Sequence, residues 1–337
     1  MTEGWNIAVL GATGAVGEAL LTLLSEREFP VGQLFPLASQ PDEADTVLFN
    51  GKNVAVQAAE EFDWAQVQLA FFVASQEASA RYADLAAESG CLVIDSSGLF
   101  AMDPSVPLVV PTVNPHMLSE YRNRNIIAVA GAAVCQALTA VKPLLEQAVL
   151  QRLNLTNLQP ASALGKRGVT ELAGQATRLL NGYPVEPVLF PAQLAFNLLP
   201  CAARMDSEGV VSEERRVVDE VRKVLQDETL PVAVQCVQAP VFYGNAQAVM
   251  LETDQMLSQL ECIEMLRDVE GIELQEGDAF PTPVGDATQN PHLTIGCVRN
   301  DYGLPQAVQF WSVADNVQFG GALMAVHSAE LLIRDYF

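Results

Sequence analysis

The segment WNIAVLGATGAVGEALLTLL, residues 5–24, decides the fold of this chain. Its first part, Trp5 to Leu10, is short and apolar and stops at a glycine. Apolar residues then recur at helical spacing, at Val16, Ala19, Leu20, Leu23 and Leu24. The segment therefore predicts a strand, a tight turn and a helix.

The turn inside this segment is rich in glycine. It follows an apolar strand and opens a helix, which is the context that a dinucleotide-binding fingerprint requires. Glycine lets the backbone approach a pyrophosphate closely, and free amide groups at the helix N-terminus then face its charge. A tight turn that binds no ligand is the alternative. The candidate cofactor-binding residues here are Gly11, Ala12, Thr13, Gly14, Ala15 and Val16.

Further strands and helices alternate through the first 130 or so residues of the chain. A helical pattern covers residues 77–88, and short apolar runs predict strands at 33–38, 54–58, 69–74, 91–95 and 126–129. Strands that alternate with helices form a mostly parallel sheet with helices on both faces. The fold class is therefore α/β, with a Rossmann-type parallel-sheet N-terminal domain.

The pattern changes after residue 132. Helical stretches are expected at 133–147, 169–179 and 213–225, and strands at 151–158, 232–237, 247–252, 293–298 and 306–313. Several of these strands alternate apolar and polar residues, as Leu153-Asn154-Leu155-Thr156 does. Such alternation indicates a sheet with one face in water or against a partner. The second region is predicted to be α+β.

Composition excludes several classes of partner. Lys+Arg number 18 against 41 Asp+Glu, so the net charge of -23 repels nucleic acid and anionic membrane surfaces alike. No apolar run is long enough to span a bilayer, and the N-terminus lacks the features of a secretory signal. A cytoplasmic protein is expected. The 6 cysteines show no Cys-x-x-Cys spacing, which argues against a metal site.

Several motifs resemble those of aspartate-semialdehyde dehydrogenases along essentially the whole chain. The family's active-site stretch is matched by residues 126–136, and its preceding segment by residues 93–97 and 103–114. The resemblance implies an α+β dimerisation and substrate domain over residues 132–315. It also implies that residues 1–131 and a returning C-terminal helix, 316–337, form the NAD(P)-binding domain.

The resemblance also indicates that the reacting groups are missing. The family's nucleophilic cysteine aligns with Ala132, and its proton-transferring histidine aligns with Asn245. A methyl group cannot attack an aldehyde, and an amide does not titrate near neutral pH. The chain is similar to the usg-type paralogues, and we expect it to be catalytically degenerate.

Substrate-binding positions are partly kept. Two arginines of the family correspond to Ala101 and Gln238, whereas the glutamine beside the nucleophile is retained as Gln159. Glu213 and Arg216 match a Glu and a Lys that bind substrate, although a solvated ion pair on an exposed helix would look the same. Asn316, on the cofactor side, is also kept.

The choice of cofactor is open between NADP and NAD. The turn that contains Ser39, a candidate cofactor contact, has no Lys or Arg where the family usually pairs an arginine with the 2'-phosphate of NADP. Asp42 could accept hydrogen bonds from a ribose, or it could be an exposed loop carboxylate.

Cys135 is the one thiol that could replace the lost nucleophile. It lies one helical turn beyond Ala132, about 4.5 Å further along the axis, because each residue rises 1.5 Å. That displacement removes it from the helix N-terminus, where a thiolate is best stabilised. A packed core thiol is the alternative.

Three functions are compatible with these observations. The first is a degenerate homodimer that keeps a nucleotide site. The second is an active oxidoreductase that reduces another aldehyde by direct hydride transfer. The third is a regulatory subunit that pairs as a heterodimer with an active paralogue.

Overall fold

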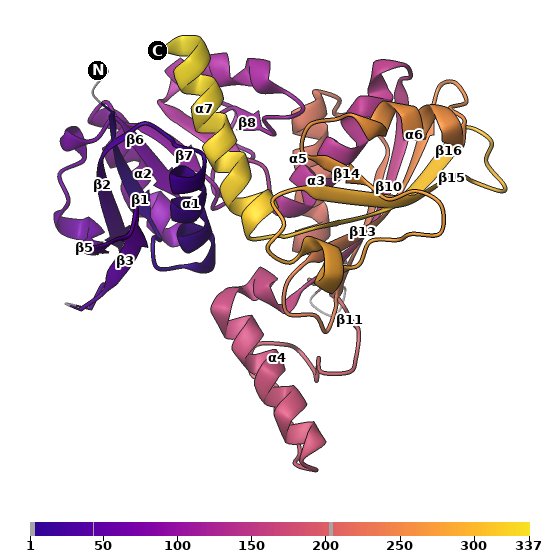
Figure 1. Ribbon diagram of the computed structural model, residues 1–337, viewed down its shortest axis with the longest axis horizontal. Coiled ribbons are helices and arrows are strands. Elements are labelled where there is room, and N and C mark those ends of the chain that lie inside the picture. The colour runs from indigo at the N-terminus through magenta and orange to yellow at the C-terminus, as the bar shows by residue number, and fades with distance from the viewer. Residues whose placement is uncertain (1–3, 43, 202–204) are drawn as a thin grey trace. The chain divides into compact units, whose positions relative to one another are not determined.

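The opening segment folds as a strand, a turn and a helix: β1 (Trp5–Leu10) and α1 (Ala15–Glu26). In the computed structural model, which describes residues 4–42, 44–201 and 205–337, the chain divides into two units. Unit 1 comprises Met1–Gly131 and Gly321–Phe337, and unit 2 comprises Ala132–Gly320. Figure 1 labels the elements of both.

Unit 1 is built on a parallel sheet in the order β5-β2-β1-β6-β7-β9-β8. Its strands are β2 (Val31–Ala38), β5 (Gln57–Ala58), β6 (Leu69–Phe72), β7 (Leu92–Asp95), β8 (Leu108–Val109) and β9 (Ile126–Val129). Because β2 and β6 lie on opposite sides of β1, the strand order reverses at β1, where ligands of such sheets bind. The Rossmann-type prediction is confirmed.

Three helices complete unit 1. They are α1, α2 (Gln76–Glu88) and α7 (Met324–Tyr336). The C-terminal helix α7 packs on α1, β7 and β9, and Arg27 of the α1 C-cap pairs with Glu330 at 2.7 Å. The sequence predicted this last helix from residue 321; a π-helical turn, Gln318–Leu323, precedes its regular part.

One strand prediction in unit 1 was wrong. Residues 54–58 were expected to form a single strand, but β3 (Thr46–Phe49) and β4 (Lys52–Ala55) form an antiparallel hairpin before β5. The turn is Asn50-Gly51, with φ of 47° and 74°. Asn-Gly suits the two positive φ angles that a tight hairpin turn requires.

Unit 2 contains a mixed sheet in the order β11-β12-β10-β13-β16-β15-β14. The strands are β10 (Leu150–Gln159), β11 (Leu199–Pro200), β12 (Val232–Gln238), β13 (Asn245–Thr253), β14 (Ile272–Leu274), β15 (Leu293–Asn300) and β16 (Ala307–Ala314). Its helices are α3 (Ala132–Val141), α4 (Gly165–Leu180), α5 (Ser212–Leu225) and α6 (Gln259–Arg267). The α+β prediction for this region is confirmed.

The two faces of the second sheet differ. Leu153, Leu155 and Asn157 of β10 are buried on the side where α3 and α5 pack. Asn154 and Thr156 point the other way and line an open groove of about 450 Å³ across β10, β12, β13 and β16. The alternation in the sequence therefore marks a sheet with one uncovered face.

Helix lengths in unit 2 differ from the predictions at two places. The helix expected over 133–147 is regular only to Val141, because Pro143 cannot continue it and residues Lys142–Glu146 form a 3-10 turn. Helix α4 begins at Gly165, four residues before the predicted start, and reaches away from the sheet of unit 2 (Figure 1). Within the described residues, no helix is long and apolar enough to cross a membrane.

Candidate functional site

The phosphate-loop residues lie at the carboxyl end of β1. Gly11 has φ 91°, and Gly14 is the N-cap of α1, with its amide donating to Gly11 O at 3.0 Å. No side chain caps this helix, so the N-terminal amides of α1 have no competing carboxylate or hydroxyl. The loop provides the donors that a phosphate would need.

Two glycines of the loop cannot be replaced without moving the backbone. A Cβ on Gly11 would lie 2.8 Å from Val73 O, and one on Gly17 would lie 2.2 Å from Gly11 O. The chain is therefore folded back on itself as closely as glycine allows. This is the cradle that a pyrophosphate fits, so the residues present are suitable for a dinucleotide.

The turn after β2 carries no positive charge. Ser39 and Asp42 are exposed, and the Asp42 amide donates to an Asp45 carboxylate oxygen at 3.0 Å. No Lys or Arg occurs between Arg27 and Lys52. A 2'-phosphate would therefore find no cationic partner in this turn.

Ala101 is packed in the core of unit 1 and is 2% exposed. A nearby arginine, Arg124, is committed to other groups: it pairs with Asp103 and Asp84, each at 2.7 Å, and its guanidinium lies 5.2 Å from the Phe100 ring centre. The position that aligns with a phosphate-binding arginine thus presents only a buried methyl group.

A polar group that the sequence did not single out lies at the carboxyl end of β7. The Ser96 hydroxyl is buried and has no hydrogen-bond partner among the described residues. The neighbouring Asp95 carboxylate is held by the hydroxyls of Ser79 and Ser97 at 2.6 and 2.8 Å. The carboxyl edge of a parallel sheet is where ligands bind, and the Ser96-Ser97 pair directly after an apolar strand was the signal available.

Ala132 opens helix α3, and its surroundings in unit 2 are tight. It is partly exposed, and a Cβ built on Gly320 would lie only 2.4 Å from its own Cβ. The side chain has no chemistry beyond packing. A helix N-terminus favours a thiolate at this point, but no thiol is there.

Asn245 is buried at the start of β13 and joins three elements. Its Nδ2 donates to Gln136 Oε1 of α3 at 2.9 Å and to Asn157 Oδ1 of β10 at 2.7 Å. Gln247 supports the same network by donating to Asn157 Oδ1 at 3.1 Å and to Ala133 O at 2.8 Å. Both amide hydrogens of Asn245 are thus used in structure, and neither amide can transfer a proton near neutral pH.

Cys135 lies fully inside the core of unit 2, with no exposed surface. Burial, and then the negative charge of Glu220, raise the pKa of its thiol far above the ordinary value. The thiolate, which is the nucleophilic form, is therefore strongly disfavoured.

Gln159 and Gln238 are neighbours across the parallel pair β10 and β12. Gln238 Nε2 donates to the main-chain oxygens of Gln159 and Pro160 at 2.9 and 2.8 Å. The Gln159 Oε1 accepts from the Cys201 thiol at 3.7 Å. Gln238, at a position aligned with an arginine, thus ties two strand ends together.

Glu213 lies in the first turn of α5 and faces a small cavity; its residues are Phe190, Pro191, Leu199, Pro200, Cys201, Glu213 and Gln238. Arg216, three residues further on, lies 3.6 Å from Glu220 instead. Asn316, at the other end of the unit 2 sequence, accepts from the Ser162 hydroxyl at 3.0 Å. The structure therefore brings Glu213 and Gln238 together and turns Arg216 to another partner.

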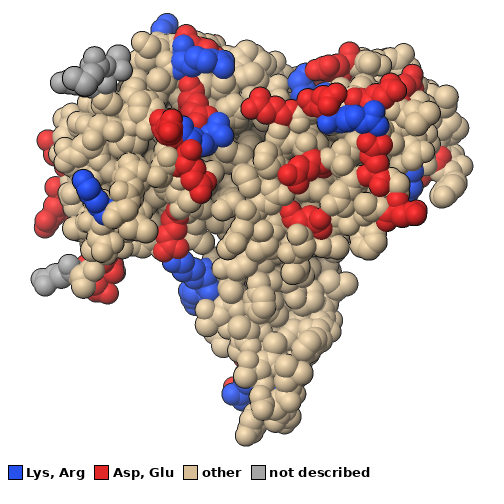
Figure 2. Space-filling model, in the orientation of Figure 1, with Lys and Arg blue, Asp and Glu red and all other residues tan. Residues whose placement is uncertain are grey.

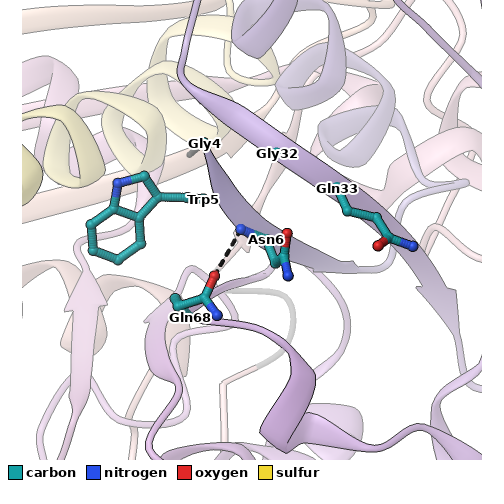
Figure 3. A pocket seen from close by; sticks show the side chains of 6 residues that line it. All are labelled: Gly4, Trp5, Asn6, Gly32, Gln33 and Gln68. Atoms are coloured by element: carbon teal, nitrogen blue, oxygen red, sulfur yellow. Dashed lines mark hydrogen bonds between the residues drawn. The ribbon is translucent and has the colours of Figure 1, made fainter. Parts of the chain in front are cut away.

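A hollow at the amino end of β1 lies away from these residues. It has a volume of about 660 Å³ and is lined by Gly4, Trp5, Asn6, Gly32, Gln33 and Gln68. Figure 3 shows the Gln68 side chain accepting the Asn6 amide, at 2.9 Å. Ligands of parallel sheets bind at the carboxyl ends, so this hollow is not part of the nucleotide site. Within the part of the chain that the structure describes, no group of three or more His, Cys, Asp or Glu could hold a metal ion.

Comparison with known families places two domains on the chain. Residues 6–121 match the NAD binding domain of semialdehyde dehydrogenases, and residues 141–319 match the dimerisation domain of the same family.

Individual relatives are similar over their whole length. Aspartate-semialdehyde dehydrogenase 2 of Vibrio cholerae is 48% identical over 337 residues, covering 100% of both chains. A USG-1 protein homolog of Azotobacter vinelandii is 39% identical and covers 99% of both. A crystal structure of Vibrio cholerae aspartate semialdehyde dehydrogenase II complexed with ASA superposes with a TM-score of 0.97 at 47% identity, covering 100% of both chains.

Proposed function

The chain belongs to the aspartate-semialdehyde dehydrogenase family, and we propose that it keeps the family's nucleotide-binding and dimerisation functions but does not carry out the cysteine-based reaction. Relatives named as enzymes and relatives named as USG-1 homologues align with it along nearly their whole length. Overall similarity therefore does not separate the two kinds of relative, and the site residues must.

The observation that carries the proposal is the methyl group of Ala132 at the start of α3. Covalent catalysis on an aldehyde needs a nucleophile at that helix N-terminus and a base within hydrogen-bond reach. Asn245, at the position aligned with the base, is held by Gln136 and Asn157. Groups that act as a unit lose nearly all their chemistry when one is missing, and here both are replaced.

Nucleotide binding is supported by the geometry of unit 1. Gly11, Gly14 and Gly17 shape the loop, and the uncapped N-terminus of α1 would face the pyrophosphate. A bound nicotinamide would supply a hydride acceptor or donor. Because the turn at Ser39 carries no cation, we expect NADP to have no advantage over NAD.

Dimerisation is supported by the match of residues 141–319 to a dimerisation domain and by the uncovered face of the unit 2 sheet. A homodimer is the simplest assembly that covers this face. An active paralogue could occupy the same face, which would make the chain a regulatory subunit.

Restoring the missing groups tests the proposal directly. Ala132→Cys combined with Asn245→His should gain measurable phosphate-dependent reduction of NAD or NADP with aspartate semialdehyde, whereas the unaltered chain should show none. Ala133→Cys combined with Asn245→His is the matched control, because it places a thiol on the adjacent residue of the same helix. Sustained turnover by the unaltered chain with any of a panel of aldehydes would contradict the proposal.

Calorimetric titration with NAD and NADP tests the retained binding. Binding of at least one nucleotide, lost in Gly17→Ala, is expected. Failure of both to bind would limit the function to dimerisation.

A further inference from the structure

The small cavity beside Glu213 has a chemical character of its own. We call it the Glu213 pocket; its lining residues are Phe190, Pro191, Leu199, Pro200, Cys201, Glu213 and Gln238. Its volume is about 20 Å³, which is enough for one group the size of a water molecule. The group that it could hold must therefore be small.

Glu213 carries the formal charge of this pocket, because the other described lining residues are apolar, an amide or a thiol. The effect on neighbouring thiols shows the sign of the local potential. Burial, and then Glu213, raise the pKa of the Cys201 thiol above its ordinary value. Burial followed by the charges of Glu213 and Glu214 raises the pKa of Cys236 to about 12.

The arginines of α5 do not compensate this charge. Arg215 binds Asp219 at 2.8 Å, and Arg216 lies 3.6 Å from Glu220, each one turn further along the helix. Gln238 offers no donor to the pocket either, because its Nε2 is used by two main-chain oxygens. An anion in the pocket would meet a carboxylate without a compensating cation, which is unfavourable in a partly buried site.

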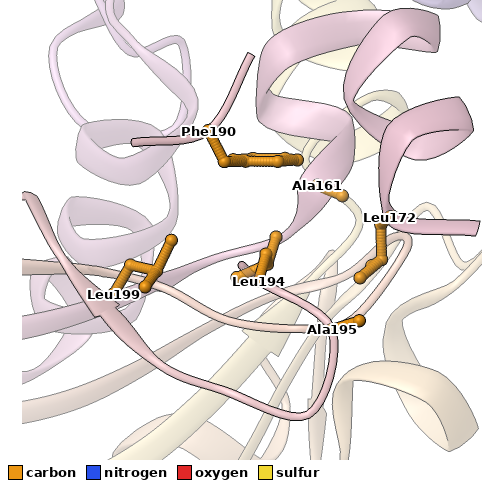
Figure 4. Packing of buried hydrophobic residues seen from close by; sticks show 6 residues of the cluster. All are labelled: Ala161, Leu172, Phe190, Leu194, Ala195 and Leu199. Carbon is orange, nitrogen blue, oxygen red and sulfur yellow. The ribbon is translucent and has the colours of Figure 1, made fainter. Parts of the chain in front are cut away.

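The opposite wall is apolar and held in place from α4. We call residues 188–195 the strap. Glu171 accepts from the amides of Val188 and Leu189 at 3.0 and 2.6 Å, and Gln175 Oε1 accepts from Leu194 and Ala195 at 2.8 and 3.1 Å. Figure 4 shows the Phe190 ring above Leu194, with Ala161, Leu172, Ala195 and Leu199 completing the cluster.

We propose that the Glu213 pocket binds the ammonium head group of a small primary amine. An ammonium group is close to water in size and brings three donors, which match the acceptors Glu213 and the side-chain oxygen of Gln238. A carboxylate paired with an aromatic and aliphatic wall is a favourable setting for such a cation. The site thus prefers a ligand that lacks a carboxylate or phosphate.

Cys201 is a built-in reporter for this proposal, because it lines the pocket and is half-buried. The full-length protein is used in a Cys297→Ser background, since Cys297 is exposed and the remaining described cysteines are buried. Alkylation of Cys201 by N-ethylmaleimide is followed by mass spectrometry with increasing propylamine, 1-propanol or propionate. Propylamine, which is protonated at neutral pH, should protect the thiol in a saturable way, and the other two should not.

Glu213→Gln should weaken this protection about tenfold or more, because a charge-assisted hydrogen bond is lost. Glu228→Gln, an exposed site beyond the other end of α5, makes the same charge change and should leave protection unaltered. Equal protection by propionate, or protection that survives Glu213→Gln, would overturn the proposal.

The thermal unfolding midpoint, measured in the same series of ligands, provides a second test that does not depend on thiol reactivity. Propylamine should raise it in the parent and not in Glu213→Gln, since a ligand that binds only the folded state stabilises it. The absence of both protection and a midpoint shift would also overturn the proposal.

Discussion

Asn245 is the residue at which a site of this kind turns from chemistry to structure. An imidazole in that place can carry a proton, whereas the amide spends both of its hydrogens on Gln136 and Asn157. Two atoms of the same network, Asn157 Nδ2 and Gln247 Oε1, are buried without a partner among the described residues. The network is thus incompletely satisfied, as expected where one polar residue has replaced another of different shape.

Removing the Asn245 amide should cost stability rather than activity. Asn245→Ala leaves two buried acceptors without their donor, which we expect to lower the free energy of unfolding by about 1–3 kcal/mol. Urea denaturation followed by circular dichroism measures the change. Gln235→Ala, on the uncovered face of β12, is the control and should be nearly neutral. An equally small effect at Asn245 would show that the network does not stabilise unit 2.

Glu171 makes the strap sensitive to acid. Burial raises its pKa, but the hydrogen bonds from the amides of Val188, Leu189 and Phe190 together outweigh this, so the pKa lies below the ordinary value. A carboxylate with a lowered folded pKa stabilises the fold above its unfolded pKa of about 4.3 and loses that contribution as the pH falls. Strap amides should therefore exchange hydrogen at a protected level near neutrality and lose extra protection below about pH 4.

The matching substitution is Glu171→Gln. Replacing the charged acceptor should weaken each strap hydrogen bond and accelerate exchange at residues 188–190 about tenfold at neutral pH. Glu186→Gln is the control, because Glu186 is an exposed carboxylate close to the strap in sequence. Unaltered exchange in Glu171→Gln would mean that packing of Phe190 and Leu194 alone holds the strap.

At the scale of elements, local signals predicted most of the fold and few of the contacts. The strand, turn and helix at residues 5–26 follow from periodicity and glycine spacing alone. The β3–β4 hairpin was missed because Asn50-Gly51 was not given the weight that its turn geometry deserves. The Glu213 pocket could not be predicted, because its walls join residues as distant as Phe190 and Gln238 and no local pattern encodes that meeting.

The phosphate loop gives a sharp test at this scale. Gly17→Ala forces a Cβ to within 2.2 Å of Gly11 O, so the turn between β1 and α1 must open. We expect a loss of about 1–3 kcal/mol in stability together with loss of nucleotide binding. Gly174→Ala, inside α4 with open space around it, should instead raise stability by about 0.5–1 kcal/mol. Calorimetry and thermal unfolding of the two variants distinguish crowding at the loop from a general effect of adding a methyl group.

At the scale of the whole molecule, charge and the uncovered sheet face act against each other. The net charge of -23 makes two copies repel at long range, and Figure 2 shows acidic side chains spread over the displayed surface. The groove on the unit 2 sheet, by contrast, is lined mainly by uncharged side chains, with Arg299 as the charged one among its described residues. Association through this face should therefore become stronger as salt screens the repulsion.

Ala248 lies exposed in this groove on β13, and it is the place to break the association. Ala248→Arg puts a long cation on a flat sheet face that a second copy would have to cover, and an unpaired charge in an interface is costly. Sedimentation velocity at low and moderate salt should show a dimer for the parent chain and a monomer for the variant. Ala65→Arg, at an exposed site in unit 1, adds the same charge and should remain dimeric. If Ala248→Arg sediments as the parent does, the sheet face is free in the assembly and the dimer forms through other surfaces.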